Sequence, residues 1–390
     1  MNANNLTSTN YRETLQDLGF IVRYNQMTGE VEVNGEVLDD KIEAAIQTQM
    51  HDYGCKNRAL VRDVILVEAV DNAFHPIRER FEKLEPWDGV PRIALLSTYL
   101  KPKNPALAAV LLRKWMIAAV SKIFHETQNM ILVIQGDQGT GKSCFAKWIA
   151  SLFPARYFTA DKLDPRNKDD QIKATRTAVW EIGELETTTG RADTGDLKRF
   201  ITQDAFTVRR PYGRYDTRMP VTASFIGTVN PAGGFLKDSS GNRRFWILDS
   251  EGIDFGYRDD FAIEDIWAEA FAAFKAGEDF TLTADEAAAN EAEQADVEIL
   301  DPVAEAIRAY FYIDLNHPEW VTSCNTVRET LQLKAGISPA QIANNLLGTA
   351  AQRLGLKSKL TRIKRGEDPV KCYRGIRLKE QTFPPDRYDN

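Results

Sequence analysis

A glycine-rich loop carries the clearest chemistry in this sequence. An apolar run at 130–135 leads into it, and residues 144–149 follow with helical spacing. The loop fits the pattern Gly-x-x-x-x-Gly-Lys-Ser/Thr and reads Gly136-Asp137-Gln138-Gly139-Thr140-Gly141-Lys142-Ser143. Its glycines let backbone N–H groups wrap around phosphates. Lys142 would reach the β- and γ-phosphates, and the Ser143 hydroxyl would complete the Mg²⁺ shell. The sequence therefore predicts a nucleoside-triphosphate site.

Two acids, Glu181 and Glu184, end the next apolar strand, expected at 177–182. A phosphate-loop enzyme needs a carboxylate near the metal and a group that orients the attacking water. Either acid could hold the hydrated Mg²⁺ while the other polarises water. Positions three apart in an extended strand point to opposite faces, so both can serve only if the chain turns near Gly183. The alternative is that one of them is a surface residue.

Polar and basic residues flank two further strands, expected at 221–229 and 245–248. Asn230 ends the first and is expected to touch the γ-phosphate or to position water. Arg243 and Arg244 precede the second. Planar guanidinium groups suit the charge of a transferring phosphoryl group, in this chain or a neighbouring subunit. The alternative is that the arginines pair with acids such as Asp238 or Asp249.

Two basic segments are candidates for nucleic-acid contact, although the net charge is −7. Basic and aromatic residues alternate between 196 and 215, a pattern that suits a single strand because cations bind phosphates and rings stack on bases. Between 353 and 379 there are ten bases and two acids, whereas 249–301 holds seventeen acids and two bases. A solvated basic surface is the alternative for both segments. The candidate residues are Lys198, Arg199, Arg209, Arg210, Tyr212, Arg214, Lys359, Arg362, Lys364 and Arg365.

The order of elements predicts an α/β protein with a parallel sheet covered by helices on both faces. A hairpin is expected at 20–34, and helices at 40–49, 57–72, 107–124, 260–276 and 283–295. Beyond 301 we expect a helix at 303–312, a strand at 320–323, a helix at 338–354 and basic strands at 359–364 and 370–378. These resemble a winged helix, with a protein-binding α/β cap as the alternative. The expected parts are 1–85, a helical connector at 86–127, the core at 128–300, a basic domain at 301–380 and a tail at 381–390.

Composition excludes several classes of protein. The chain has 390 residues, 43% hydrophobic and 27% charged, as ordinary soluble proteins do. No apolar run approaches a membrane span, and the first residues lack the features of a signal peptide. Four cysteines lie far apart without a Cys-x-x-Cys pair, so neither a disulfide framework nor a zinc site is expected. A cytoplasmic location, without membrane contact, fits these features.

Several segments between about 85 and 250 together resemble the virulence-associated protein E family of phages and mobile genetic islands, which is similar to superfamily 3 helicases. Besides the phosphate loop they are Trp87-Asp88-Gly89, Trp180-Glu181-Ile182-Gly183-Glu184-Leu185, Leu197-Lys198-Arg199-Phe200, Arg210-Pro211-Tyr212-Gly213, Gly227-Thr228-Val229-Asn230 and Gly241-Asn242-Arg243-Arg244-Phe245. The resemblance implies a P-loop NTPase of AAA+-like, three-layer fold that binds ATP and Mg²⁺. It also implies a homo-hexameric ring with single-stranded DNA in the pore, forked DNA as substrate, and replication proteins of the host or element as partners.

Residue by residue, the resemblance makes Lys142 and Ser143 the Walker A residues, Glu181 and Glu184 the Walker B acids, and Asn230 sensor 1. Arg243 or Arg244 would be the arginine finger, and residues 198–214 would place a pore hairpin on DNA. The acids of superfamily 3 are usually adjacent, whereas here two residues separate them, so both assignments of their roles stay open. The N-terminal region has no clustered acids with a histidine, and we expect no primase activity. The function expected is an ATP hydrolase acting as a DNA helicase. The alternatives are an ATP-switched replication initiator or regulator and a small-molecule kinase.

Overall fold

The computed structural model describes residues 6–185, 194–209, 216–230, 242–296, 302–339, 342, 344–362 and 368–379. The chain divides into two compact units, Met1–Glu298 and Ile299–Asn390. In the described residues, no helix combines the length and the apolar character needed to cross a bilayer.

The first unit begins with a small α/β region. Its elements are α1 (Ser8–Asp17), β1 (Val22–Tyr24), β2 (Val31–Val33), β3 (Glu36–Val37), α2 (Asp40–Asp52), α3 (Arg58–Asp71) and α4 (Pro76–Glu82). β1 and β2 pair antiparallel, which confirms the expected hairpin, and both expected helices are present. Side chains cap the helices: Asp39 accepts the backbone N–H of Ile42 in α2, and Asn57 accepts that of Leu60 in α3.

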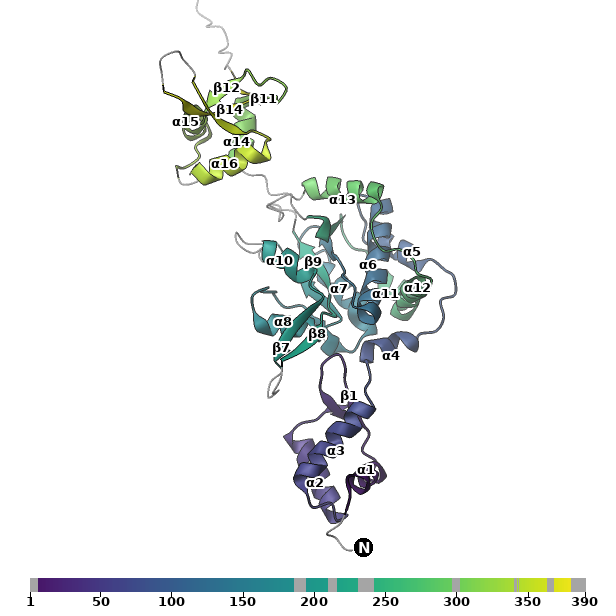
Figure 1. Ribbon diagram of the computed structural model, residues 1–390. Helices are drawn as coiled ribbons and strands as arrows, with labels where there is room; N and C mark the ends of the chain where they lie inside the picture. Colours follow the sequence, from purple (N-terminus) through teal and green to yellow (C-terminus); the bar gives the residue numbers. More distant parts are fainter. Residues whose placement is uncertain are drawn as a thin grey trace, which may run out of the picture. The chain divides into compact units, whose positions relative to one another are not determined.

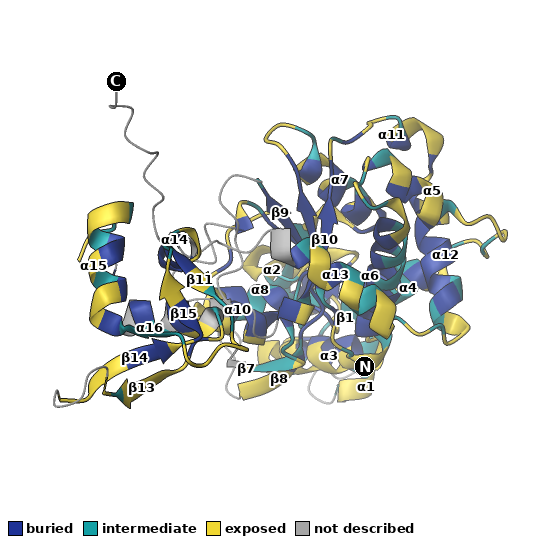
Figure 2. Cartoon of the chain, turned by 90° about the horizontal axis from the view of Figure 1, so that it is seen from above, coloured by how far each residue is buried: buried dark blue, intermediate teal, exposed yellow. Residues whose placement is uncertain are grey.

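A five-stranded sheet with only parallel pairings forms the centre of this unit. Its order is β10 (Phe245–Asp249), β4 (Ile131–Gln135), β9 (Ser224–Val229), β6 (Val179–Ile182) and β5 (Phe158–Thr159). Every residue of β4, β6, β9 and β10 is buried (Figure 2). Strands covered on both faces need continuous apolar runs, and this confirms the expected parallel sheet.

Helices cover both faces of the sheet, as expected. Figure 1 shows α6 and α12 on one side and α8 and α10 on the other. Leu132 and Ile134 of β4 face one core cluster, whereas Ile131 and Val133 face the other, because alternate side chains of a strand point to opposite faces. The helices are α5 (Arg92–Tyr99), α6 (Pro105–His125), α7 (Lys142–Ile149), α8 (Lys168–Ala174), α10 (Thr194–Ile201), α11 (Tyr257–Asp260), α12 (Ile263–Lys275) and α13 (Ala284–Asp296).

Shorter elements connect these layers. They are the 3-10 turns η1 (Ala150–Leu152), η2 (Ala155–Tyr157) and η3 (Asn242–Arg244) and the antiparallel hairpin of β7 (Ala205–Arg209) and β8 (Asp216–Pro220). The helix expected at 260–276 is present as α12, which begins only at Ile263 because Phe261, where α11 ends, is extended and buried. The tip of the β7–β8 hairpin lies outside the described residues.

The second unit contains α14 (Pro302–Tyr310), β11 (Phe311–Ile313), β12 (Val321–Ser323), α15 (Cys324–Ala335), α16 (Asn344–Arg353), β13 (Ser358–Thr361), β14 (Val370–Arg374) and β15 (Ile376–Leu378). One antiparallel sheet has the order β12-β14-β13, and β11 pairs with β15. The sequence interpretation missed α15. Its signals are ordinary ones: the Ser323 hydroxyl accepts the N–H of Thr326 at 3.0 Å, and Gly336 ends the helix with a φ of 65°.

Candidate nucleotide site

The loop expected to bind phosphate leaves β4 at Gly136 and enters α7 at Lys142. Gly139 and Gly141 have φ angles of 81° and 98°, which lie in the left-handed region. A Cβ at Gly136 would come within 2.7 Å of the Ser250 carbonyl oxygen, so a side chain does not fit there. No side chain caps the start of α7. The loop thus presents the uncapped N–H groups of a helix start, a common anion-binding arrangement.

Lys142 is 8% exposed, and its ammonium group is held by oxygens of the loop. Nζ donates to the carbonyl oxygens of Gly136 at 2.6 Å and Asp137 at 2.7 Å. It also lies 3.4 Å from Oδ1 of Asn230, which follows β9. The structure therefore brings together two residues that lie 88 positions apart and that the sequence analysis assigned to the phosphates.

Glu181 lies in β6, the next strand of the sheet beyond β9, and only 3% of the residue is exposed. The hydroxyls of Ser143 and Thr228 donate to its carboxylate. Burial raises the pKa of Glu181, while these two hydrogen bonds favour the charged form and oppose that rise. Ser143, expected to complete the Mg²⁺ shell, is therefore a hydrogen-bond partner of Glu181, one of the two acids that could hold Mg²⁺.

Glu184 reaches the same site because the chain turns directly after β6. Its φ of 49° is in the left-handed region, and the side chain is exposed. This turn at Gly183 meets the condition stated above for Glu181 and Glu184 to act in the same site. Lys142, Ser143, Glu184 and Asn230 line one cavity of about 340 Å³. Gln138, Gly139 and Cys144 also line it.

The structure does not bring Arg243 and Arg244 to this cavity. They form η3 immediately before β10, whose register pairs Phe245 with Ile131 and Asp249 with Gln135. The arginines therefore lie where the strands begin, and the phosphate loop lies where they end, about 16 Å away for a strand of this length. Arg243 is exposed, and Nε of Arg244 lies 3.3 Å from the Thr202 hydroxyl.

The alternative partners considered for these arginines were Asp238 and Asp249. Asp249 binds Lys103, with 2.6 Å between the carboxylate and Nζ. Asp238 lies outside the described residues. Arg243 instead lines a separate cavity of about 210 Å³ together with Glu291.

The candidate DNA contacts differ in exposure. Arg199 is exposed, as are Lys359 in β13 and Arg362. Lys198 is only 6% exposed, so little of its side chain is accessible to solvent, and its contact with DNA stays a prediction. Arg209 ends β7. The remaining candidates, Arg210, Tyr212, Arg214, Lys364 and Arg365, lie outside the described residues.

Two residues near the cavity were missed by the sequence analysis. Thr228 donates to Glu181, and its position near the end of a buried strand beside Asn230 could have indicated this. Phe255 follows β10, is 44% exposed and packs so closely on Gly141 that a Cβ there would collide with its ring. No sequence motif connects Phe255 to the loop, because only the fold places the chain after β10 beside α7.

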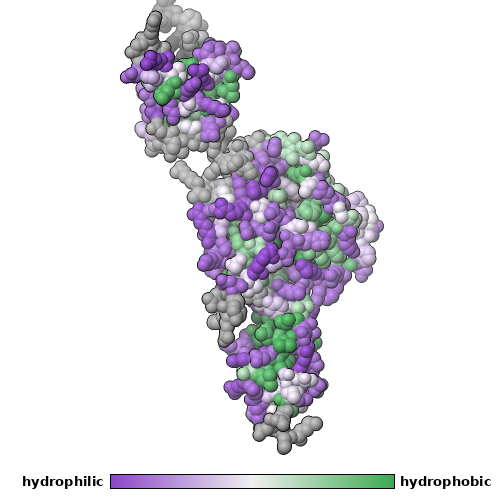
Figure 3. Space-filling view, in the orientation of Figure 1, coloured by the Kyte–Doolittle hydropathy of each residue, from purple (hydrophilic) through white to green (hydrophobic). Residues whose placement is uncertain are grey.

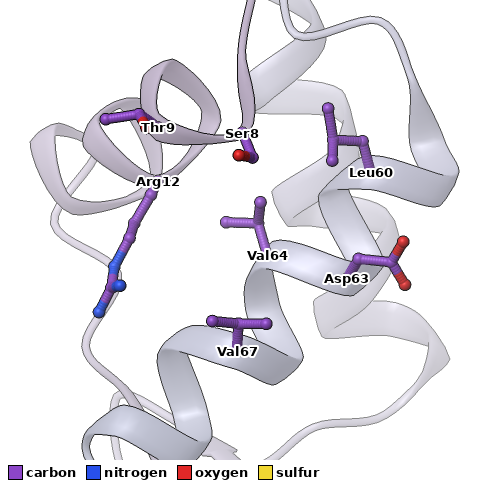
Figure 4. Close-up of a pocket in the computed structure, with 7 residues that line it drawn as sticks. All are labelled: Ser8, Thr9, Arg12, Leu60, Asp63, Val64 and Val67. Atoms are coloured by element: carbon purple, nitrogen blue, oxygen red, sulfur yellow. The ribbon is translucent and has the colours of Figure 1, made fainter.

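A second hollow lies far from this chemistry, between α1 and α3 (Figure 4). It measures about 310 Å³ and is lined by Ser8, Leu60 and Val64 among others. The guanidinium group of Arg12 is engaged by Glu68 and by Asp71. Figure 3 shows apolar surface in this part of the chain, where the exposed side chains include Leu66, Val67 and Val70. The hollow offers packing surface and no arrangement of reactive groups.

Comparisons with known proteins agree with this geometry. Residues 81–299, more than half of the chain, match the family described as the virulence-associated protein E-like domain. The apo structure of the NrS-1 C-terminal region is similar over 95% of this chain and 100% of that one, with a TM-score of 0.55 and 12% identity. Its A form gives a TM-score of 0.52 at 13% identity, covering 94% and 98% of the two chains. Similarity at such identities shows a shared fold. No curated protein matches the chain significantly.

Proposed function

This chain belongs to the virulence-associated protein E-like family, and we propose that it is an ATP-hydrolysing motor that unwinds DNA as superfamily 3 helicases do. Replication of a phage or mobile element is the proposed setting. One observation carries the proposal: Lys142, Ser143, Glu184 and Asn230 line a single cavity, and Ser143 is hydrogen-bonded to the buried Glu181. These are the parts that ATP hydrolysis needs.

The residues fit ATP with Mg²⁺. The Glu181 carboxylate is buried, and its two hydrogen-bond donors are neutral hydroxyls, so a divalent cation would supply the missing positive charge. Carboxylate and hydroxyl oxygens are ligands that Mg²⁺ accepts. When bound, ATP with Mg²⁺ would supply the phosphoryl group for transfer and neutralise part of its charge.

The geometry supports different roles for the two acids. Glu181 is buried against Ser143 and is the proposed metal ligand. Glu184 is exposed to the cavity, where it can orient a water molecule and accept its proton. Lys142 would exchange the carbonyl oxygens of its own loop for phosphate oxygens. Asn230, which already contacts Lys142, would help to orient the water.

The position of Arg243 supports completion of the site by a neighbouring subunit. It lies at the opposite end of the strands from the phosphate loop and is exposed, so it cannot serve its own site but can serve another chain's. A ring of identical subunits with ATP between them, such as the hexamer of the related helicases, supplies each site with one arginine.

Two surfaces support DNA binding. The β7–β8 hairpin carries Arg209 at the end of its first strand and corresponds to the segment expected to project into the pore. We propose that the second unit is a winged helix. The order α14, β12, α15, α16, β13 and β14, with β12 beside β14, supports this proposal, and the paired strands β11 and β15 are additional to that pattern. Its exposed bases include Lys357, Lys359, Arg362, Lys371, Arg374 and Arg377, and clustered bases bind nucleic-acid phosphates.

The deciding measurement is the rate of ATP hydrolysis alone and with single-stranded DNA, duplex DNA or RNA, followed by unwinding of a forked duplex. Lys142→Ala provides the blank. We expect single-stranded DNA to stimulate hydrolysis and the forked duplex to be unwound only when ATP is hydrolysed. A hydrolysis rate that no nucleic acid changes would contradict the motor. Stimulation without unwinding would indicate an ATP-switched DNA-binding protein instead.

A further inference from the structure

A buried ammonium group lies at the end of the sheet opposite the phosphate loop. Lys122 near the end of α6 is 2% exposed, and its Nζ has no hydrogen-bond partner among the described residues. The centroid of the Phe225 ring is 5.9 Å from Nζ, which is near the limit for a cation–π interaction. Burial of a charged group without a partner is costly. An anionic ligand would therefore stabilise the charged form of Lys122.

Lys122 lines a small pocket rich in hydrogen-bond donors. The pocket measures about 190 Å³, and Arg78, His75, Gln26 and Thr222 line it too. One nitrogen of the Arg78 guanidinium donates to the Ile123 carbonyl oxygen at 2.9 Å. Its other N–H groups belong to a planar fork suited to oxyanions.

His75 is a neutral donor in this pocket. Its Nδ1 accepts the backbone N–H of Arg78 at 3.3 Å, so the neutral ring carries its proton on Nε2. Burial lowers the pKa of His75 to about 4, with the charge of Arg78 acting in the same direction. The ring therefore stays neutral at pH 7 and adds a donor without a second buried charge.

The carboxylates near the pocket do not neutralise Lys122. Glu126 lines the pocket and is bound by Arg218 at 3.1 Å. Asp204 is exposed and accepts the Gln128 amide at 3.3 Å; its charge acts on Lys122 only from a distance. Burial lowers the pKa of Lys122 to about 8, so the group is still mainly protonated at pH 7.

We propose that this pocket binds a phosphate group, with Lys122 and Arg78 as its charged ligands and His75 as a neutral donor. The volume favours a single phosphate group over a nucleotide, since the cavity at the phosphate loop is nearly twice as large. Pro220 at the base of the β7–β8 hairpin also lines the pocket. A bound phosphate group would lie directly beneath the root of this hairpin. The group can come from inorganic phosphate or from a nucleic-acid backbone, because both present the same oxygens.

The test is calorimetric titration of inorganic phosphate into the full chain carrying Lys142→Ala, which removes the competing loop site. Lys122→Met is added to this background, and Lys83→Met, which removes an exposed charge directly after α4, is the matched control. We expect Lys122→Met to weaken binding at least tenfold and Lys83→Met to leave it unchanged. At pH 8, where Lys122 is about half deprotonated, binding should take up about half a proton, measured in buffers of different ionisation enthalpy.

Several outcomes distinguish the possibilities. Equal phosphate affinity in the Lys122→Met protein, or no binding at millimolar phosphate, would overturn the proposal. Competition by a thymidine oligonucleotide would identify a backbone phosphate as the ligand, and its absence would identify free phosphate. Methionine should keep or raise the melting temperature without phosphate, since it removes an unpaired buried charge. If it instead prevents folding, Arg78→Gln tests the same pocket from its second ligand.

Discussion

Replacement of Arg243 by alanine tests whether each ATP site is shared between two chains. Arg243 precedes β10, whereas the phosphate loop follows the neighbouring parallel strand, so the length of the strand separates them within one chain. The proposed function therefore requires the arginine to act on the site of the next subunit. Lys142→Ala removes the other half of that site.

The geometry predicts a definite outcome when the two inactive variants are mixed. Arg243→Ala alone should lower kcat by roughly 10³–10⁵, the usual contribution of an arginine finger. In an equal mixture, an interface is complete only when the chain holding ATP has Lys142 and its neighbour has Arg243. Random assembly gives that pairing in one of four cases, so the mixture should recover about a quarter of the wild-type rate, whatever the ring size.

The assay measures steady-state ATP hydrolysis after the variants have been dissociated and reassembled together. A mixture of wild type with Lys142→Ala calibrates subunit exchange. Arg58→Ala, which removes an exposed arginine from the start of α3, should keep the full rate and controls for loss of positive charge. A mixture no faster than the sum of its separate components would refute the shared site.

Three further predictions concern single residues. Glu184→Gln should lower kcat by a factor of about 10²–10⁴ with ATP binding retained. Glu181→Gln should instead raise the Mg²⁺ concentration that gives the half-maximal rate. Identical Mg²⁺ titrations of the two variants would contradict the separate roles. Phe255→Ala should raise the KM for ATP and leave kcat nearly unchanged, because the ring packs on Gly141; an unaltered KM would exclude this residue from the site. The depressed pKa of His75 means that the unfolded chain binds more protons than the folded chain between about pH 6.5 and 4. As the pH falls through this window, the free energy of unfolding should therefore decrease by up to roughly 3 kcal/mol. His75→Asn keeps an acceptor at the start of α4 and should flatten this loss in unfolding measurements at each pH.

Much of the fold could be predicted from the sequence because buried parallel strands need uninterrupted apolar runs. The runs expected at 130–135 and 245–248 form the neighbouring strands β4 and β10. The long apolar helix at 107–124 became α6 almost within its expected bounds. α15 was not predicted, because its clearest signals are the single capping residues Ser323 and Gly336. Local hydrogen bonds, rather than a strong apolar pattern, mark the ends of that helix.

The candidate site was predictable only in part. The loop motif and the strand-end residue Asn230 follow from local sequence, and the structure places Lys142 beside Asn230. The isolation of Lys122 could not be predicted, since it depends on packing among α4, α6 and the start of β9. The separation of Arg243 from the loop depends on the direction of β10 relative to β4. No spacing between two motifs gives that direction.

In the proposed ring, strand direction connects the chemistry of the ATP site with the contact between subunits. β4, β6 and β9 deliver Lys142, Glu181 and Asn230 to one edge of the sheet, because parallel strands end on the same side. β10 has the same direction, so the arginines before it lie at the other edge. There Arg244 contacts Thr202, between α10 and β7, at the root of the β7–β8 hairpin. In the proposed motor, a shift of the hairpin on DNA would act on the turn that holds Arg243, and through it on the neighbour's ATP site. Each chain carries a phosphate-loop site and an arginine, but in the proposed motor the two act together only across the contact between neighbouring chains.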